Sequence, residues 1–401
     1  MKIAKLSLVA AVAVAGLSTA NAQPLEEAIK NVDVSGSVVY RYNDHNDNDL
    51  GSQANPSSST NYYKVGVNLS SKVNDDVKFN SRVLVADDSG DFAEGGLDTQ
   101  SGNDANPTLS LSHANFAYTG IMNTTVTVGK QGLTTPWTVA LDSDGNEQTG
   151  TGILALSTVG PVTLAGAYFN QTNLNNSGDV KGTLNSLANT NAGNNDIATV
   201  GAIATLGAVT LDAWYLDMNQ VFDSYTVGAK VADEVSGIKL GGEARYSSVN
   251  ADDLTTDNAG GKIVLTADAG LVDAKVAYGW TDKEGGIVAL DRDATTSLIG
   301  WNLWLNDKTD ADYWQAVLGF DILSNLNLSA NYGNLQYIAA ANSTTDIEEE
   351  EVYAQLSYKM SKNLNTYARY GTYTKETTAQ GAATVENNDD VRGRLQVEYT
   401  F

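Results

Sequence analysis

The segment Val391-Arg-Gly-Arg-Leu-Gln-Val-Glu-Tyr-Thr-Phe401, at the end of the sequence, decides the fold. Its odd-numbered residues are apolar or glycine, whereas its even-numbered residues, from Arg392 to Thr400, are polar. Successive side chains of a β-strand point to opposite faces of the sheet, so this pattern predicts a strand with one apolar and one polar side. A strand of this kind needs an apolar environment on one side and water on the other.

The same alternation recurs along the whole chain in segments of about ten residues, which is the sequence pattern of a transmembrane β-barrel. Tyr63, Val65, Val67 and Leu69, for example, are interleaved with polar residues such as Lys64. A closed sheet of this size leaves an aqueous channel rather than a packed core, so we expect the polar side to face inward. The aromatic Phe401 at the end of the last strand is typical of outer-membrane barrels and is expected to serve membrane insertion.

Short and long connections alternate between these segments. Counting them predicts an all-β, antiparallel transmembrane barrel of about 18 strands, with about 16 as the alternative. An even number places both termini on the periplasmic side, beside the short turns, and lets the last strand pair with the first. The long loops are then extracellular. Within the long connection Thr281–Asp312, the segment Ser297–Leu305 is a candidate for an additional strand.

Composition and the N-terminal segment indicate the compartment. Lys2 and Lys5, an apolar stretch and Ala20-Asn-Ala22 form a signal-peptide pattern, which predicts a signal peptide at 1–22 and a barrel domain at 23–401. The chain has no cysteine, and 48 acidic residues outnumber 24 lysines and arginines. This charge disfavours nucleic acid as a partner and favours cations. We therefore expect a protein of the Gram-negative outer membrane, in contact with lipid and lipopolysaccharide.

Basic residues are expected to gather on one part of the lumen. Strand parity places them inside, and closure of the barrel would bring their strands together into a basic wall. The residues are Arg41, Lys64, Lys78, Arg82, Arg369, Arg392 and Arg394.

The third long loop, Gly132–Gly150, is expected to fold inward, because its first half carries Leu133, Pro136 and Trp137. Its acids Asp142, Asp144 and Glu147 would then form a pore constriction opposite the basic wall. Opposed charges across a narrowing create a transverse field that disfavours apolar solutes. The alternatives are an exposed acidic turn and a basic wall neutralised by lumenal acids. The three acids also have the oxygen density of a Ca²⁺ site, without EF-hand spacing. We expect no required cofactor, with Ca²⁺ at these residues as the one candidate.

Catalytic chemistry has little support in the sequence. His45 lies in the first acidic loop and His113 on a predicted strand, and neither has a recognisable nucleophile motif nearby. Neither a glycine-rich phosphate loop nor an H-E-x-x-H motif is present. The sequence therefore predicts a protein without catalytic residues.

The block Gln23-Pro-Leu-Glu-Glu-Ala-Ile-Lys-Asn-Val-Asp-Val-Ser-Gly36, followed by Arg41-Tyr42, resembles the mature start of the major outer membrane porins of Campylobacter and related bacteria. The length, the strand pattern and the terminal Phe401 agree with that family. The resemblance implies an 18-stranded barrel, a homotrimer, a third loop that narrows the pore and passive diffusion with some cation preference. It also implies Ca²⁺ near the constriction.

We expect a general diffusion porin, a water-filled channel for small hydrophilic solutes and ions with a mild preference for cations. Two alternatives stay open. The first is a substrate-selective channel in which the basic wall guides carboxylates. The second is a structural protein or adhesin for which the barrel is only a scaffold.

Overall fold

The computed structural model describes residues 32–48, 57–86, 108–188, 195–252 and 257–401. The predicted signal peptide and the acidic second loop at 87–107 lie outside these residues. Strands dominate the described part, and they form one sheet of 18 strands in which each strand pairs antiparallel with its neighbours in sequence. No helix among the described residues is long and apolar enough to cross a membrane.

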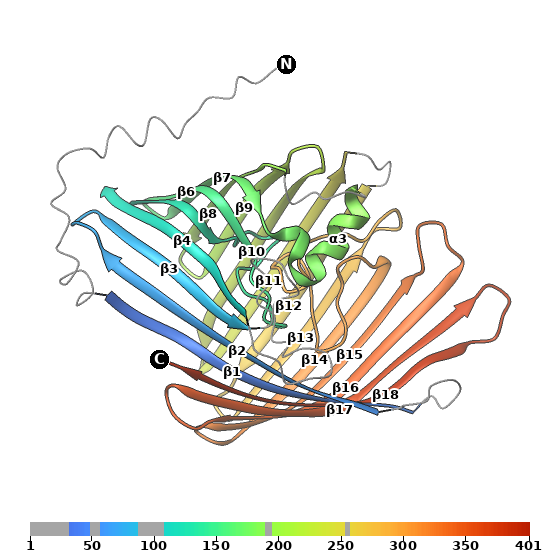
Figure 1. Ribbon diagram of the computed structural model, residues 1–401. Coiled ribbons are helices and arrows are strands. Elements are labelled where there is room, and N and C mark those ends of the chain that lie inside the picture. Colours follow the sequence, from blue (N-terminus) through green and yellow to red (C-terminus); the bar gives the residue numbers. More distant parts are fainter. Residues whose placement is uncertain (1–31, 49–56, 87–107, 189–194, 253–256) are drawn as a thin grey trace.

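The strands are arranged in a ring (Figure 1). Their bounds are β1 Val32–Asp47, β2 Ser57–Lys72, β3 Val77–Ala86, β4 Thr108–Ile121, β5 Thr124–Gly132, β6 Thr149–Val159, β7 Val162–Thr172, β8 Ile197–Leu206, β9 Val209–Met218, β10 Phe222–Val235, β11 Ile238–Ala251, β12 Asp257–Asp268, β13 Val272–Thr281, β14 Thr309–Leu323, β15 Leu326–Ile338, β16 Thr345–Lys359, β17 Leu364–Ala379 and β18 Val385–Thr400. The predicted count of 18 is thus confirmed.

The barrel closes where β1 pairs with β18, from Ser37 opposite Thr400 to Asp47 opposite Asp390. Phe401 extends this seam, because its N–H donates to the carbonyl of Gly36 at 3.0 Å and its carbonyl accepts from the N–H of Gly36 at 2.9 Å. The Phe401 ring lies against the Gly36 backbone, since a Cβ at Gly36 would fall 2.7 Å from its Cζ. A glycine is therefore required at this point of the seam.

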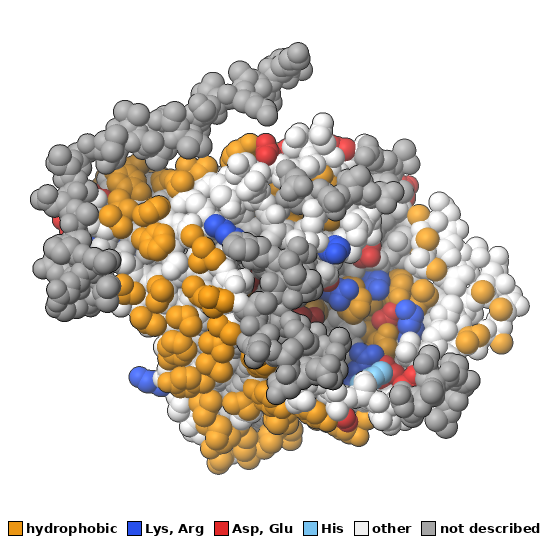
Figure 2. All heavy atoms as spheres, in the orientation of Figure 1, with side chains coloured by type: hydrophobic (Ala, Val, Ile, Leu, Met, Phe, Trp, Pro, Cys, Tyr) orange, Lys and Arg blue, Asp and Glu red, His pale blue; other side chains and the backbone are white. Residues whose placement is uncertain are grey.

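The two faces of the barrel wall differ as the alternation predicts. On β14, for example, Trp314, Leu318 and Phe320 lie on the outer face and are at least half exposed, whereas Tyr313, the residue before Trp314, is buried. Figure 2 shows apolar side chains covering the outer wall and charged side chains gathered in the hollow. This is the inside-out arrangement that a barrel needs in lipid.

Connections alternate in length around the ring, as expected. Most turns at one end are tight, such as 236–237, where Ser236 and Gly237 take positive φ values of 54° and 82°. The connection between β9 and β10 lies on the side of the long loops, although it spans only 219–221. Within 282–308, the candidate extra strand is a single bridge between Ile299 and Trp304, and it does not join the barrel.

Three long loops fold together inside the barrel mouth, and we call them loop 3 (133–148), loop 4 (173–188 and 195–196 among the described residues) and loop 7 (282–308). Loop 4 contains a short 3₁₀ helix, η1 Leu174–Asn176, and the helix α3 Gly178–Ala188, which lies within the ring of strands (Figure 1). The three loops and the strand residues beneath them share one apolar cluster. Its members include Trp137, Leu174, Val180, Leu184, Leu187, Phe169, Phe222, Val249, Ile287 and Leu290.

Candidate functional site at the pore constriction

Loop 3 folds inward, as predicted, because its apolar half is buried against the wall and against loop 7. The Trp137 ring is fully buried, and its Nε1 donates to the Ser247 hydroxyl of β11 at 3.2 Å. The backbone carbonyl of Trp137 accepts the N–H groups of Leu290 and Asp291 at 2.9 Å and 3.0 Å. Loops 3 and 7 are therefore joined by main-chain hydrogen bonds into one layer across the lumen.

Glu147 of loop 3 contacts the basic wall directly, and this contact is shielded from solvent. Its side chain is 1% exposed and pairs with Arg82 Nη2 at 2.7 Å and Lys64 Nζ at 2.8 Å. Ser112 on β4 also donates to it. Burial alone would raise the pKa of Glu147, but Lys64 and Arg82 outweigh burial and lower the pKa to about 2. Glu147 therefore anchors the loop to the wall rather than facing bases across open water.

Two of the wall's bases also hold the backbone of loop 3. Lys64 Nζ donates to the carbonyl of Gly145 at 2.6 Å, and Arg41 Nη2 donates to the carbonyl of Ser143 at 2.6 Å. Asp144 is 66% exposed and lies 3.5 Å from Arg41 Nη1. Of the three predicted acids, Asp144 is the one that presents its carboxylate to solvent.

The remaining predicted bases do not touch loop 3. Arg392 pairs with Asp390 on its own strand and donates to Asn302 of loop 7 at 2.7 Å. Arg394 and Arg369 each donate from Nε to an amide oxygen of a neighbouring strand, Asn43 and Gln355 respectively, at 2.8 Å. Lys78 is exposed near the turn between β2 and β3 and forms no ion pair with a described residue.

Three carboxylates from three different loops come together within the described part of the chain. Asp142 of loop 3, Asp179 at the start of α3 and Asp291 of loop 7 present oxygens within 4.8 Å of one another. Asp142 and Asp291 are buried, at 8% and 0% exposure. We call these residues the carboxylate triad. The predicted set of Asp142, Asp144 and Glu147 thus shares only Asp142 with it.

The carboxylate triad has little compensating charge among the described residues. Arg292 Nε lies 3.2 Å from Asp179, and no other ion pair of the described residues reaches the three. Asp142 accepts from the N–H and side chain of Asn146 at 2.8 Å and 3.0 Å. Burial and neighbouring carboxylates raise the pKa of Asp142 to about 7, and burial and Asp179 raise that of Asp291. Hard oxygen ligands in excess of positive charge fit the ligand chemistry of Ca²⁺.

A second ionic group lies on β9, β11 and β12, and the sequence analysis did not assemble it. Arg245 pairs with Asp212 at 2.7 Å and with Glu243 at 3.4 Å. Lys262 lies 3.8 Å from Glu243 and donates to the carbonyl of Ser297 in loop 7 at 2.9 Å. Through Lys262, this second ionic group holds loop 7 to the barrel wall, as the basic wall holds loop 3. Strand parity could have marked these side chains as lumenal.

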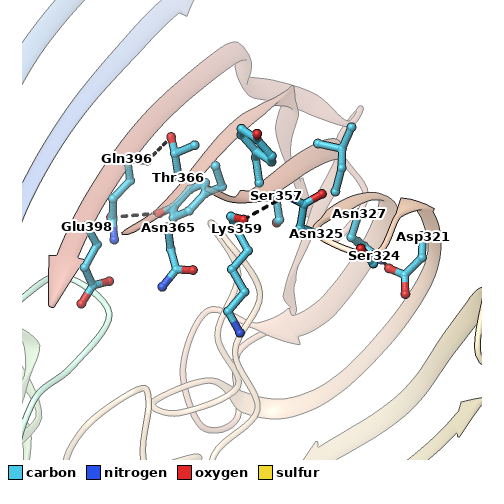
Figure 3. Close-up of a pocket in the computed structure, with 13 residues that line it drawn as sticks. Asp321, Ser324, Asn325, Asn327, Ser357, Lys359, Asn365, Thr366, Gln396 and Glu398 are labelled. Atoms are coloured by element: carbon cyan, nitrogen blue, oxygen red, sulfur yellow. Dashed lines mark hydrogen bonds between the residues drawn. The ribbon is translucent and has the colours of Figure 1, made fainter. Parts of the chain in front are cut away.

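Towards the end with the short turns, the lumen stays open. A hollow of about 440 Å³ lies on the inner face of β14 to β18, with polar side chains from each strand. Figure 3 shows Lys359, Asn365 and Glu398 pointing the same way, into this space. Both signs of charge line it, as expected for a water-filled passage.

The fold is shared with solved outer-membrane porins. OccK2 (OpdF) of Pseudomonas aeruginosa is 15% identical, with 92% of this chain and 98% of that chain covered and a TM-score of 0.72. OccAB3 of Acinetobacter baumannii is 14% identical, with 93% and 99% covered and a TM-score of 0.72. A BenF-like porin from Pseudomonas fluorescens Pf-5 is 16% identical, with 93% and 99% covered and a TM-score of 0.71.

Sequence comparison gives a family. A search of curated proteins returned no match. The family model described as Campylobacter major outer membrane protein matches residues 1–401, which is the whole chain.

Proposed function

The chain belongs to the Campylobacter major outer membrane protein family and is an outer-membrane porin, and we propose that it is a general diffusion porin with a mild preference for cations. The main support for this proposal is the closed barrel, whose outer face is apolar and whose lumen is charged and hollow. Small hydrophilic solutes and ions would pass down their own gradients, between the inward loops and the wall. The family and the fold belong to a channel rather than an enzyme, and the proposed role uses no catalytic residue.

The cation preference is supported by charge. The chain carries a formal net charge of −24. Three residues of the basic wall, Arg41, Lys64 and Arg82, donate hydrogen bonds to loop 3. The exposed Asp144 remains to attract cations. Planar-bilayer recordings under a KCl gradient test this, with a reversal potential of cation-preferring sign expected. A reversal potential of the opposite sign would refute the preference while leaving the porin function intact.

General diffusion and solute selection are separable by flux. In liposome swelling, a general porin admits arabinose and glucose at rates that fall smoothly with size and do not saturate. The structure of OccK2 in complex with glucuronate makes that sugar acid a suitable probe of the alternative. Saturable entry of glucuronate alone would favour a substrate-selective channel. Entry of no sugar at all would favour a structural or adhesive protein on a barrel scaffold.

We further propose that the protein works as a homotrimer in contact with lipid and lipopolysaccharide, after removal of a signal peptide at 1–22. Exposed apolar side chains around the barrel support contact with lipid or a second subunit. Crosslinking of detergent-extracted protein tests the trimer, and N-terminal sequencing of the purified protein tests the cleavage.

Ca²⁺ is proposed at the carboxylate triad of Asp142, Asp179 and Asp291. Support comes from three clustered, largely buried carboxylates with one ion-pair partner among the described residues. A bound divalent cation would neutralise their repulsion, and these side chains would hold loops 3, 4 and 7 together around it. Calorimetric titration of chelator-treated protein with Ca²⁺ should show one site per subunit, and a flat titration would reject it.

A further inference from the structure

Two arginines of the lumen face each other without an acid between them. Arg369 on β17 and Arg394 on β18 are direct cross-strand partners in the register of the two strands. Like charges directly opposite each other on one face destabilise a sheet. Among the described residues, no carboxylate lies within ion-pair distance of either guanidinium. We call these two residues the arginine pair.

Both residues of the arginine pair keep N–H donors that their own hydrogen bonds do not use. Each guanidinium uses its Nε, Arg369 towards Gln355 and Arg394 towards Asn43, both at 2.8 Å. No hydrogen bond from an Nη group of either residue is formed with another described residue. Each of these planar forks therefore keeps donors for a planar anion, and carboxylate is the group whose geometry matches them.

Aromatic rings surround the same place. Trp301, at the tip of loop 7, has its ring centroid 5.2 Å from the Arg369 guanidinium and 5.9 Å from that of Arg394. Tyr353 and Tyr367 lie at 5.0 Å and 5.1 Å from Arg369. These rings position the cations and add an apolar surface beside them.

Loop 7 is held in place here by a dedicated contact. Both oxygens of Glu351, a buried residue of β16, accept backbone N–H groups, from Trp301 at 3.0 Å and from Asn302 at 2.7 Å. Glu351 is thereby committed to the loop rather than to the arginine pair. The backbone at Trp301 is thereby held, and its ring packs edge-on against Tyr353 with ring centroids 5.3 Å apart.

An open pocket adjoins the arginine pair. It measures about 320 Å³, and Arg394 is the member of the pair that lines it. The other lining residues include Arg392, Trp301, Tyr62, Asn302 and one carboxylate, Asp44. The side-chain Nδ2 of Asn302 is a buried donor without a hydrogen-bond partner among the described residues. A pocket of this size, with unpaired donors and an aromatic wall, suits one small ring-bearing anion.

We propose that the arginine pair and Trp301 form a binding site for small aromatic carboxylates in transit through the lumen. The carboxylate is bound by the free Nη groups, and the ring of the solute packs beside Trp301. The site rests on the proposed porin function and adds a solute class that pauses within a channel otherwise favouring cations.

Single-channel recording of the purified full-length protein tests this with benzoate at pH 7. Benzoate should interrupt the KCl current in a manner that saturates with concentration, whereas acetate and the neutral benzyl alcohol should not at the same concentrations. The R369Q/R394Q variant should raise the half-saturating benzoate concentration about tenfold or more, since it removes charge-assisted hydrogen bonds. W301L should weaken the binding of benzoate, while neutral benzyl alcohol should still have no effect on the current.

The matched control is K275Q, because Lys275 is a lumenal base on β13 that bonds only to the amide of Gln315 among the described residues. It should leave the benzoate response unchanged. The proposal is overturned by an absent benzoate response in the wild type, by an equal response to acetate, or by an equal loss in K275Q. A wild type that conducts KCl but ignores benzoate refutes this site alone, whereas one that does not conduct refutes the porin function. Heat-dependent migration in SDS gels reports folding, and R394K replaces the double variant if that fails to fold.

Discussion

Arg82 and Glu147 form a two-point ion pair inside the barrel, with Arg82 Nη2 2.7 Å from Oε1 and Nε 3.0 Å from Oε2 of Glu147. Lys64 completes the group at 2.8 Å. This pair is the point at which loop 3 is fastened to the wall, so the width of the passage depends on it.

Glu147→Gln should release loop 3. Removing one partner of a buried ion pair leaves the other charge uncompensated, which costs about 3–5 kcal/mol. We expect a higher and noisier single-channel conductance and a weaker cation preference, because Lys64 and Arg82 then face the lumen unpaired. E234Q is the matched control, since Glu234 is an exposed side chain near the turn between β10 and β11. Equal recordings from E147Q and wild type would contradict the anchoring role.

The difference between wild type and E147Q should depend on pH. The pKa of Glu147 is lowered to about 2 in the folded protein, below the value of about 4.3 for an unperturbed glutamate. A lowered pKa means that the ion pair contributes fully above pH 4.3 and is lost as the pH falls through about 2. Conductances of the two proteins should therefore still differ at pH 4 and converge near pH 2. The subtraction removes other titrating acids, because both proteins contain them. Convergence already at pH 5 would contradict the lowered pKa.

Asp179→Asn should weaken Ca²⁺ binding, while Asp144→Asn should not. Asp179 belongs to the carboxylate triad, and Asp144 is 66% exposed beside Arg41. Calorimetry on chelator-treated protein should show a loss of at least about tenfold in affinity for D179N, because a charged ligand is removed. The reverse order of effects would restore the ligand set expected from loop 3 alone.

Gly36→Val should impair closure of the barrel. A Cβ at Gly36 would lie 2.2 Å from the carbonyl oxygen of Gly66 and 2.7 Å from the Phe401 ring. The yield of folded barrel, read from heat-dependent migration in SDS gels, should fall several-fold. G166A is the control, because a Cβ at Gly166 meets no atom within 4 Å. Folding of G36V at the wild-type yield would show that the seam tolerates a side chain.

The barrel was readable from the sequence because each strand carries its own alternation. Trp314, Leu318 and Phe320 lie outward on β14 as their parity predicts. The helix α3 was missed, although Val180, Leu184 and Leu187 recur at helical spacing and become its buried face. The residues around this short apolar stripe are mostly polar, so the segment resembled an ordinary loop.

The site was only partly readable. Parity placed Arg41, Lys64 and Arg82 inward, and the apolar half of loop 3 indicated that Glu147 would face them across a narrowing. The direct ion pairs of Glu147 with Lys64 and Arg82 were not predicted. Asp179 and Asp291 reach Asp142 only through the packing of loops 4 and 7, and no local pattern encodes that packing. The cross-strand contact of Arg369 with Arg394 depends on register, which alternation alone does not fix.

The apolar cluster shared by loops 3, 4 and 7 links segments that are remote in the gene. Recombination that imports one of them from a divergent strain would pair it with ill-fitting neighbours, so the three should be inherited as a set. The connections at 339–344 and 380–384 lie on the same side of the barrel as these loops but contribute nothing to that cluster among the described residues. Substitutions in those two connections should therefore alter the outer end of the barrel without changing what the channel admits.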